Sequence, residues 1–105
     1  MEIDDAKIQK VIDLLGRLSF PPSYLLKLVS SSGRGDKQLL AFNLCDGTRS
    51  QSEIAKEVRI DRGNFSRTIA RWIELGIVFK LTGNEYPMHI YPLSDETIKS
   101  INVGE

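Results

Sequence analysis

Hydrophobic residues recur at helical spacing through the first half of the chain and predict three helices in succession. The first runs from about Asp4 to Leu18 and has one apolar stripe, formed by Ile8, Val11, Ile12, Leu15 and Leu18. A second, short helix is expected over about residues 24–29, between a proline-containing break and a Ser/Gly-rich loop. The third, from Lys37 to about Cys45, is apolar nearly all round its axis, so we expect it to be buried.

The segment from residue 46 to 78 predicts two further helices joined by a tight turn. Ser50-Gln51-Ser52-Glu53 is a capping box. In this motif the serine hydroxyl accepts a hydrogen bond from the glutamate amide, and the glutamate side chain accepts one from the serine amide. A helix therefore begins near Gln51. Asp61 can cap a second helix over about 62–75, and the glycine that follows tolerates the left-handed conformation past its end.

The second of these helices has two different faces. At 100° per residue, Phe65, Ile69 and Trp72 fall on one side, which we expect to lie in the core. Arginine and polar side chains fall on the opposite side. A helix of this kind can enter the major groove of DNA, where base edges suit Arg and Asn. The alternative is that these charges only keep an exposed helix face solvated.

Two β-rich apolar segments follow this helix directly. Residues 77–81 and 88–91 flank a turn-forming cluster and predict a two-stranded hairpin, to which Thr48-Arg49 could add a short third strand. With the hairpin in place, two segments resemble parts of winged helix-turn-helix regulators of the MarR and ArsR type. Ser50-Gln51-Ser52-Glu53-Ile54-Ala55 is similar to their positioning helix. Phe65-Ser66-Arg67-Thr68-Ile69-Ala70-Arg71-Trp72-Ile73-Glu74-Leu75-Gly76-Ile77-Val78 is similar to their recognition helix and its exit into the wing.

The resemblance implies an α+β fold that is mostly α, with a three-helix core and a β-hairpin wing over residues 36–93. An N-terminal helical extension over 1–33 and a short C-terminal helix with its tail over 94–105 would complete a single domain. The implied function is that of a transcriptional regulator that binds double-stranded DNA sequence-specifically through the helix 62–75. We also expect a homodimer through the N-terminal helix. The alternative is that this helix packs internally onto the helix that contains Leu39–Leu44.

The expected DNA-reading surface takes side chains from the starts of both helices. Asn64 and Arg67 lie where a recognition helix reaches deepest, so they are candidates for adenine and guanine edges. Arg71, one turn later, is a candidate for a phosphate contact, as are the hydroxyls and amides at the start of the preceding helix. The candidate set is Thr48, Ser50, Gln51, Arg62, Asn64, Ser66, Arg67 and Arg71.

The net charge of the chain is zero, which argues against strong binding to nucleic acid, but the charge is unevenly distributed. Residues 34–80 hold nine basic and six acidic side chains, an excess of three positive charges that suits modest, salt-sensitive binding. Glu85 stands near the hairpin tip, where DNA-binding wings usually carry Arg or Lys. Ile73 places an apolar side chain beside the core face. These two residues keep an alternative open, a winged-helix protein–protein interaction module within a larger complex.

Residues that could support catalysis or metal binding are sparse. The one cysteine, Cys45, is expected to be a small buried hydrophobe. The one histidine, His89, is expected to lie on a strand with its side chain facing the protein surface. One Cys and one His cannot supply a zinc site, and no catalytic pair stands out, so we expect no enzyme activity, metal or cofactor, and the sequence identifies no effector. No signal peptide or membrane-spanning segment is visible, so we expect a cytoplasmic protein without a membrane partner.

Overall fold

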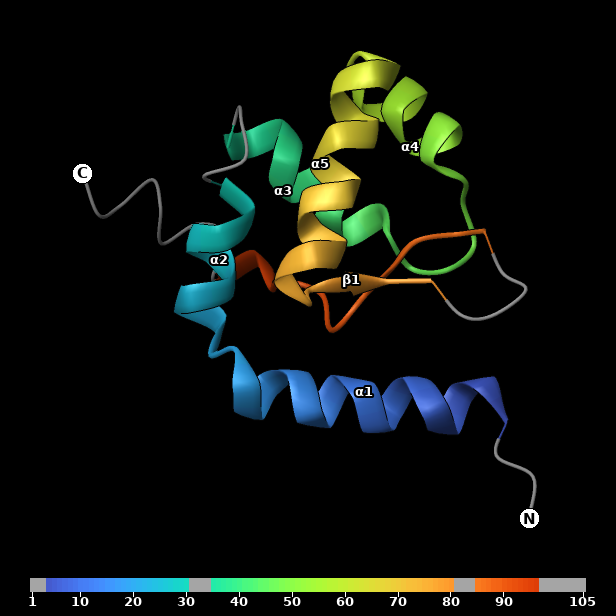
Figure 1. Ribbon diagram of the computed structural model, residues 1–105. Helices are drawn as coiled ribbons and strands as arrows, with labels where there is room; N and C mark the ends of the chain where they lie inside the picture. The colour runs from blue at the N-terminus through green and yellow to red at the C-terminus, as the bar shows by residue number, and fades with distance from the viewer. Residues whose placement is uncertain (1–3, 31–34, 81–84, 97–105) are drawn as a thin grey trace.

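Helices make up most of the structure, a computed structural model that describes residues 4–30, 35–80 and 85–96. Over these ranges the elements are α1 (Asp5–Ser19), α2 (Pro22–Ser30), α3 (Gly35–Leu44), α4 (Gln51–Val58), α5 (Arg62–Leu75), β1 (Val78–Phe79) and β2 (Met88–His89) (Figure 1). The two strands form a small antiparallel sheet. The expected class, α+β and mostly α, is therefore confirmed.

The ends of α4 and α5 lie where the sequence predicts them. The capping box is formed, because the Glu53 amide donates to Ser50 Oγ at 3.1 Å and the Ser50 amide donates to Glu53 Oε1 at 3.0 Å. Asp61 accepts a hydrogen bond from the Asn64 amide at 2.9 Å and so begins α5. Gly76 ends α5 with a φ of 84°, in the left-handed region that favours glycine.

The core lies where α2, α3, α4 and α5 meet. Trp72 is fully buried and meets Phe42 and Phe65 edge-on, at ring-centroid distances of 5.4 and 6.1 Å. Ile69 is buried on the same side of α5. The predicted orientation of α5 is therefore confirmed. Cys45 is also buried, as expected, and burial raises the pKa of its thiol to about 12.

The hairpin is shorter than the sequence predicts, and the proposed third strand is wrong. Val78 pairs with His89, and Phe79 with Met88. The residue that bridges to this pair is Asp46, opposite Met88, and Thr48-Arg49 is not a strand. The reason is local, since the amide and hydroxyl of Thr48 both bind the Asp46 side chain and fold residues 46–48 into a turn.

His89 is a second correction, because it is buried and not on the surface. Only 5% of its area is exposed, and its ring packs against that of Phe42 at 5.6 Å. Its amide donates to the carbonyl of Cys45 at 2.6 Å, which attaches β2 to the end of α3. Burial lowers the pKa of His89, although the nearby Asp46 and Asp13 act in the opposite direction.

The apolar stripe predicted for α1 divides between two sides of the helix. Ile8 and Ile12 are half-buried, whereas Val11, Leu15 and Leu18 are exposed together with Leu14. Gly16 explains the division, because α1 approaches Ile90 and Tyr91 along its glycine side. A Cβ added to Gly16 would lie 2.9 Å from the Cβ of Ile90, so no larger residue fits there without displacement. In Figure 1, α1 lies at the opposite end of the molecule from α4.

Helix α3 is less completely buried than its composition suggests. Leu39, Ala41 and Phe42 are buried, but Leu40 is 58% exposed. The expected C-terminal helix begins with residues 95–96, and its remainder lies outside the described residues, as does the hairpin tip at 81–84. In the part of the chain that the structure describes, none of the helices combines the length and apolar character needed to cross a bilayer.

Candidate nucleic-acid interface

The turn between α4 and α5 fixes the angle at which the two helices meet. Arg59 ends α4 in the left-handed conformation, with φ 59° and ψ 50°, and its amide donates to carbonyls in the last turn of α4. The Lys37 Nζ of α3 donates to the carbonyl of Arg59 at 3.1 Å. Asp61 follows and caps α5 through its side chain. The starts of α4 and α5 are thereby brought close together.

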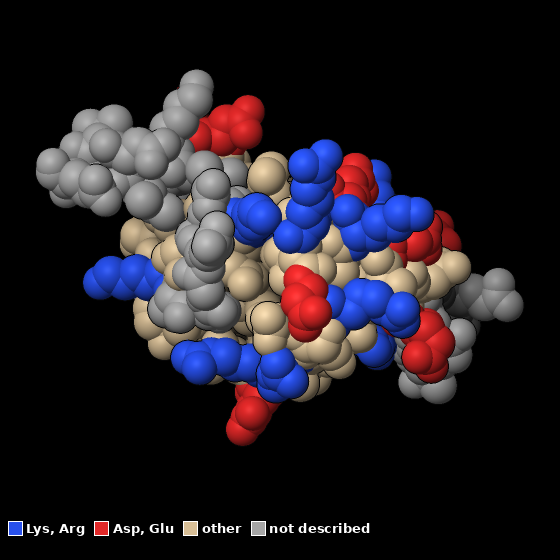
Figure 2. All heavy atoms as spheres, turned by 90° about the horizontal axis from the view of Figure 1, so that it is seen from above, with Lys and Arg blue, Asp and Glu red and all other residues tan. Residues whose placement is uncertain are grey.

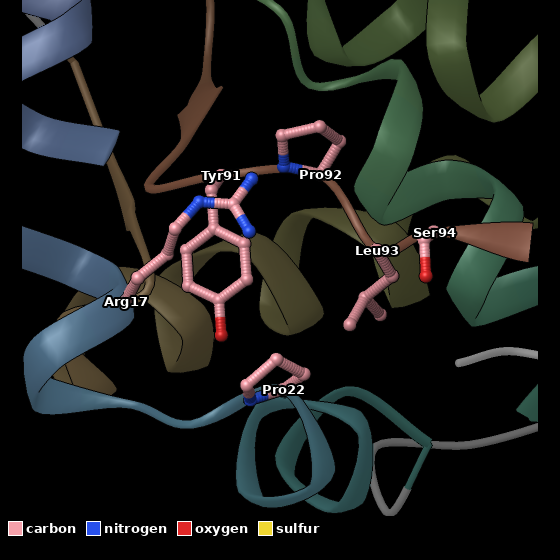
Figure 3. Close-up of a pocket in the computed structure, with 6 residues that line it drawn as sticks. All are labelled: Arg17, Pro22, Tyr91, Pro92, Leu93 and Ser94. Carbon is pink, nitrogen blue, oxygen red and sulfur yellow. The ribbon is translucent and has the colours of Figure 1, made fainter. Parts of the chain in front are cut away.

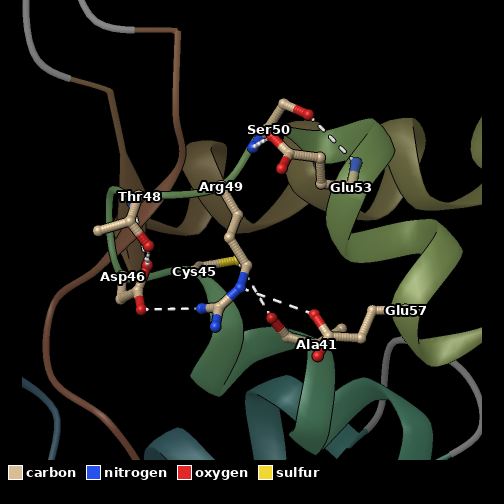
Figure 4. A network of polar contacts seen from close by, with 8 residues as sticks. All are labelled: Ala41, Cys45, Asp46, Thr48, Arg49, Ser50, Glu53 and Glu57. Carbon is tan, nitrogen blue, oxygen red and sulfur yellow. Dashed lines mark hydrogen bonds and ion pairs between the residues drawn. The ribbon is translucent and has the colours of Figure 1, made fainter.

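The segment before α4 is held by a network centred on Asp46 (Figure 4). Thr48 Oγ1 donates to Asp46 Oδ1 at 2.5 Å, and Arg49 Nη1 donates to Asp46 Oδ2 at 2.9 Å. Arg49 also pairs with Glu57 of α4, Nε to Oε2 at 3.6 Å. Burial tends to raise the pKa of Asp46, but the hydrogen bonds from Thr48 and the charge of Arg49 outweigh it and lower that pKa. The guanidinium of Arg49 is therefore engaged by two carboxylates of the same chain.

Two of the candidate hydroxyls already have internal partners. Thr48 is exposed, but its hydroxyl proton is donated to Asp46, which leaves only acceptor capacity for a ligand. Ser50 Oγ accepts the hydrogen bond of the capping box, so its own proton remains to be donated. Gln51 is half-buried at the start of α4.

The outer face of α5 carries the other candidates. Arg62, Asn64, Ser66, Arg67 and Arg71 are all exposed. By helical phase, Asn64, Arg67 and Arg71 lie on the side of α5 away from its buried aromatic residues. Within the described ranges, ion pairs form at Arg17 and Arg49, and none forms at the three arginines of α5. These arginines are therefore not neutralised by Asp61 or Glu74. The structure thus brings the α5 candidates together on one open surface.

An open hollow of about 410 Å³ lies where the two helix starts meet. Gln51 and Ser52 line it from α4, and Arg62, Gly63 and Ser66 line it from α5. Because Gly63 has no side chain, the backbone of α5 is accessible at this point. Ser52 is a lining residue that the sequence analysis missed. The sequence could have indicated it, because Ser52 lies in the first turn after the capping serine, where backbone amides lack partners within the helix.

Asn64 and Arg67 are joined to each other. The Nη2 of Arg67 donates to the side-chain oxygen of Asn64, one turn earlier on α5. Asn64 is also fixed through its backbone, since its amide donates to Asp61 and its carbonyl accepts from Thr68 Oγ1 at 3.1 Å. The two side chains proposed for base edges therefore form one unit.

The charge on this end of the molecule is of mixed sign. Figure 2 looks down on it from the side of α4 and the start of α5, and Lys and Arg side chains project from several places with Asp and Glu side chains standing among them. On the face seen in Figure 2, the described residues present separate cations and no continuous positive band. At the hairpin, Glu85 and Tyr86 are both exposed. Ile73 is 41% exposed on α5.

A smaller hollow of about 170 Å³ lies between α1 and the segment after β2 (Figure 3). Its lining is Arg17, Pro22, Tyr91, Pro92, Leu93 and Ser94. The guanidinium of Arg17 lies over the ring of Tyr91 at 4.5 Å, and its Nε donates to Asp13 at 2.6 Å. This hydrogen bond and the charge of Asp13 raise the pKa of Arg17. The hollow belongs to the joint that attaches α1 to the rest of the fold.

The residue types at these two hollows do not identify a function by themselves. In residues 4–30, 35–80 and 85–96 there is no group of three or more His, Cys, Asp or Glu side chains that could hold a metal ion. Comparisons of the chain with protein-family models, with curated proteins and with solved structures find no match. The functional argument therefore depends on the geometry of the α4–α5 surface.

Proposed function

We propose that this chain is a winged helix-turn-helix protein that binds double-stranded DNA sequence-specifically and regulates transcription, with α5 as its recognition helix and the β1–β2 hairpin as its wing. The observation that carries the proposal is the open polar surface at the starts of α4 and α5, where Arg62, Arg67 and Arg71 have no carboxylate partner among the described residues. A protein with this role acts in the cytoplasm, on chromosomal DNA.

The exposed face of α5 suits a close approach to base edges. The major groove is about 12 Å wide, and a helix with its side chains is about 10–12 Å across. Along this face the arginines alternate with the small exposed residues Gly63, Ser66 and Ala70. Small side chains let the helix backbone enter the groove, while the longer ones reach the bases and the phosphates on either side.

Arg67 is the side chain best placed to read a base. A guanidinium has five N–H donors, and the contact with Asn64 uses one of those on Nη2. The remaining donors suffice for the paired contact to guanine O6 and N7. Asn64 accepts from Arg67, so in this proposal it first orients the arginine and adds a contact to a neighbouring base through its amide protons.

Phosphate contacts fall to the start of α4 and to Arg71. The capping box uses the amides of Ser50 and Glu53, and no hydrogen bond within the described residues uses those of Gln51 and Ser52. Free amides at a helix start attract anions, because the helix dipole favours negative charge there. Gln51 and Ser52 line the hollow between the two helices, so a phosphate there would meet both helices together.

The test is a fluorescence anisotropy titration of mixed genomic DNA fragments, and then of a selected site, at several salt concentrations. Arg67→Ala should lose about 1–3 kcal/mol of binding free energy at the selected site and relax specificity at one base pair. Arg71→Ala should weaken binding to all sequences alike and reduce the salt slope by about one. Arg71→Lys should keep that slope, since it keeps the charge.

Lys27→Ala is the control. It removes one positive charge from an exposed position on α2, so affinity for DNA should stay unchanged. If the unaltered protein shows no salt-dependent binding at tens of micromolar, the proposal fails, because the dissociation constant even for non-specific DNA is typically about 100 µM or lower.

One further observation favours the alternative function, a protein-interaction module within a larger complex. Acidic side chains stand among the basic ones on this face, and the apolar Ile73 of α5 is 41% exposed. Protein interfaces combine such apolar and Arg side chains. A protein that shows no salt-dependent DNA binding, captures a specific protein partner and loses that partner on Ile73→Glu would decide for this alternative.

A further inference from the structure

The outer face of α1 carries four apolar side chains that no described part of the chain covers. Val11, Leu14, Leu15 and Leu18 are 52, 56, 58 and 82% exposed. At 100° per residue they fall within an arc of about 100°. A stripe of this width matches the seam along which one helix packs against one other helix.

The stripe cannot turn inward, because the opposite side of α1 is already attached to the fold. Gly16 lies so close to Ile90 that it leaves no room for a side chain, and Ile12 packs against the core. Arg17 stacks on the ring of Tyr91, as Figure 3 shows. A rotation of α1 would break these contacts. Whatever covers the stripe must therefore come from outside the described fold.

The charges of α1 indicate what kind of partner fits. The helix and its cap contain three acidic residues and three basic ones, so their net charge is zero: Asp4, Asp5 and Asp13 against Lys7, Lys10 and Arg17. Helices that bind anionic lipid carry an excess of Lys and Arg beside the apolar face. A neutral helix lacks that attraction, and a second neutral apolar stripe is its natural complement.

We propose that the occupant is a second copy of this chain, with the two α1 helices packed antiparallel about a two-fold axis that passes between Leu14 and Leu15. In this register Val11 lies opposite the partner's Leu18, and Leu14 lies opposite the partner's Leu15. All four exposed apolar side chains then meet apolar side chains. The two helix dipoles also run in opposite directions, which is favourable. This interface does not depend on the proposed binding of DNA.

Sedimentation velocity of the full chain over a range of concentrations tests the interface. The unaltered protein should change from monomer to dimer as its concentration rises through the micromolar range. The double variant Leu14→Glu/Leu18→Glu should stay monomeric with an unchanged melting curve, because both side chains are exposed in the single chain. Leu40→Glu is the control: this leucine is 58% exposed, close to the 56% of Leu14, but it lies on α3, so the dimer should persist.

Engineered cysteines test the register. Leu14→Cys should form a disulfide-linked dimer under mild oxidation, since the two copies of residue 14 face each other with an offset of only one residue along the helix axes. Val11→Cys should not form one, because the two copies of residue 11 are offset by seven residues along the helix axes, about 10 Å, which is beyond the span of a disulfide. The native Cys45 does not interfere, since it is fully buried and burial raises its pKa to about 12.

Three results would overturn the proposal. One is a protein that stays monomeric at all concentrations, and another is a dimer that survives Leu14→Glu/Leu18→Glu. The third is cross-linking of Val11→Cys in preference to Leu14→Cys, which would refute this register. Sedimentation with vesicles of phosphatidylcholine and phosphatidylglycerol completes the series, since binding that the double variant loses would assign the stripe to lipid.

Discussion

Replacing Trp72 with alanine should remove a large part of the stability of this domain. Trp72 is fully buried on α5 and meets Phe42 and Phe65 edge-on. Truncation of a buried aromatic residue to alanine costs about 3–5 kcal/mol, and each edge-on pair contributes about 0.5–1.5 kcal/mol beyond its buried area. We expect a loss near the upper end, about 4–5 kcal/mol. A domain of this size has a total stability of about 5–15 kcal/mol, so Trp72→Ala should be marginally folded.

Urea denaturation measures the effect, with far-UV circular dichroism as the signal because the substitution removes the one tryptophan. The midpoint should fall while the slope of free energy against urea stays similar. Trp72→Phe is the control: it keeps an apolar ring in place and should lose less than half as much. A loss below about 1 kcal/mol for Trp72→Ala would place this side chain outside the core and would refute the orientation of α5 on which the proposed DNA surface depends.

Two further predictions concern the histidine and the turn. Because burial lowers the pKa of His89 in the folded state, the unfolded chain binds more protons between that pKa and about 6.5. The free energy of unfolding should therefore fall as pH drops below about 6.5, by up to about 1.4 kcal/mol per pH unit, and His89→Gln should flatten the dependence between pH 5 and 6.5; an unchanged slope would contradict the burial of His89. Arg59→Gly should raise the free energy of unfolding by about 0.5–1 kcal/mol in thermal or urea melts, since it removes about 1–2 kcal/mol of left-handed strain against about 0.5–1 kcal/mol of added chain entropy. Arg59→Ala keeps the strain, so a gain there equal to that of Arg59→Gly would exclude this explanation.

Helix boundaries and the core face of α5 could be predicted because they depend on short-range rules. A capping box acts over three residues, and the positions of Phe65, Ile69 and Trp72 follow from the helical repeat alone. The side of α1 that packs inward could not be predicted in this way. It depends on Gly16 meeting Ile90, a contact between residues 74 positions apart, and the apolar pattern of α1 is wide enough to allow either side.

In the candidate surface, too, one part could be predicted from short-range rules and another part could not. The exposure of Arg67 and Arg71 follows from the phase of α5, whereas Arg62 is exposed because it lies in the first turn of the helix. The partners of polar side chains do not follow from any period, and here they change the roles of individual residues. The Thr48 hydroxyl donates a hydrogen bond to Asp46, and the Asn64 side chain accepts one from Arg67. His89 was misplaced for a related reason: strand alternation gives two faces, but in this fold α3 covers the face that carries the histidine.

Residues 45–49 connect the hairpin to the start of α4, so the two parts of the proposed DNA surface are not positioned independently. The carbonyl of Cys45 accepts from His89, and the amide of Gly47 donates to the carbonyl of Pro87 at 3.0 Å, which fixes the hairpin on one side. On the other side Arg49 joins Asp46 to Glu57 of α4 (Figure 4). A duplex that met both α4 and the hairpin would find them held in one geometry before binding, which lowers the entropy lost on association. Loosening this joint should therefore weaken binding even though none of its bonds reaches the duplex.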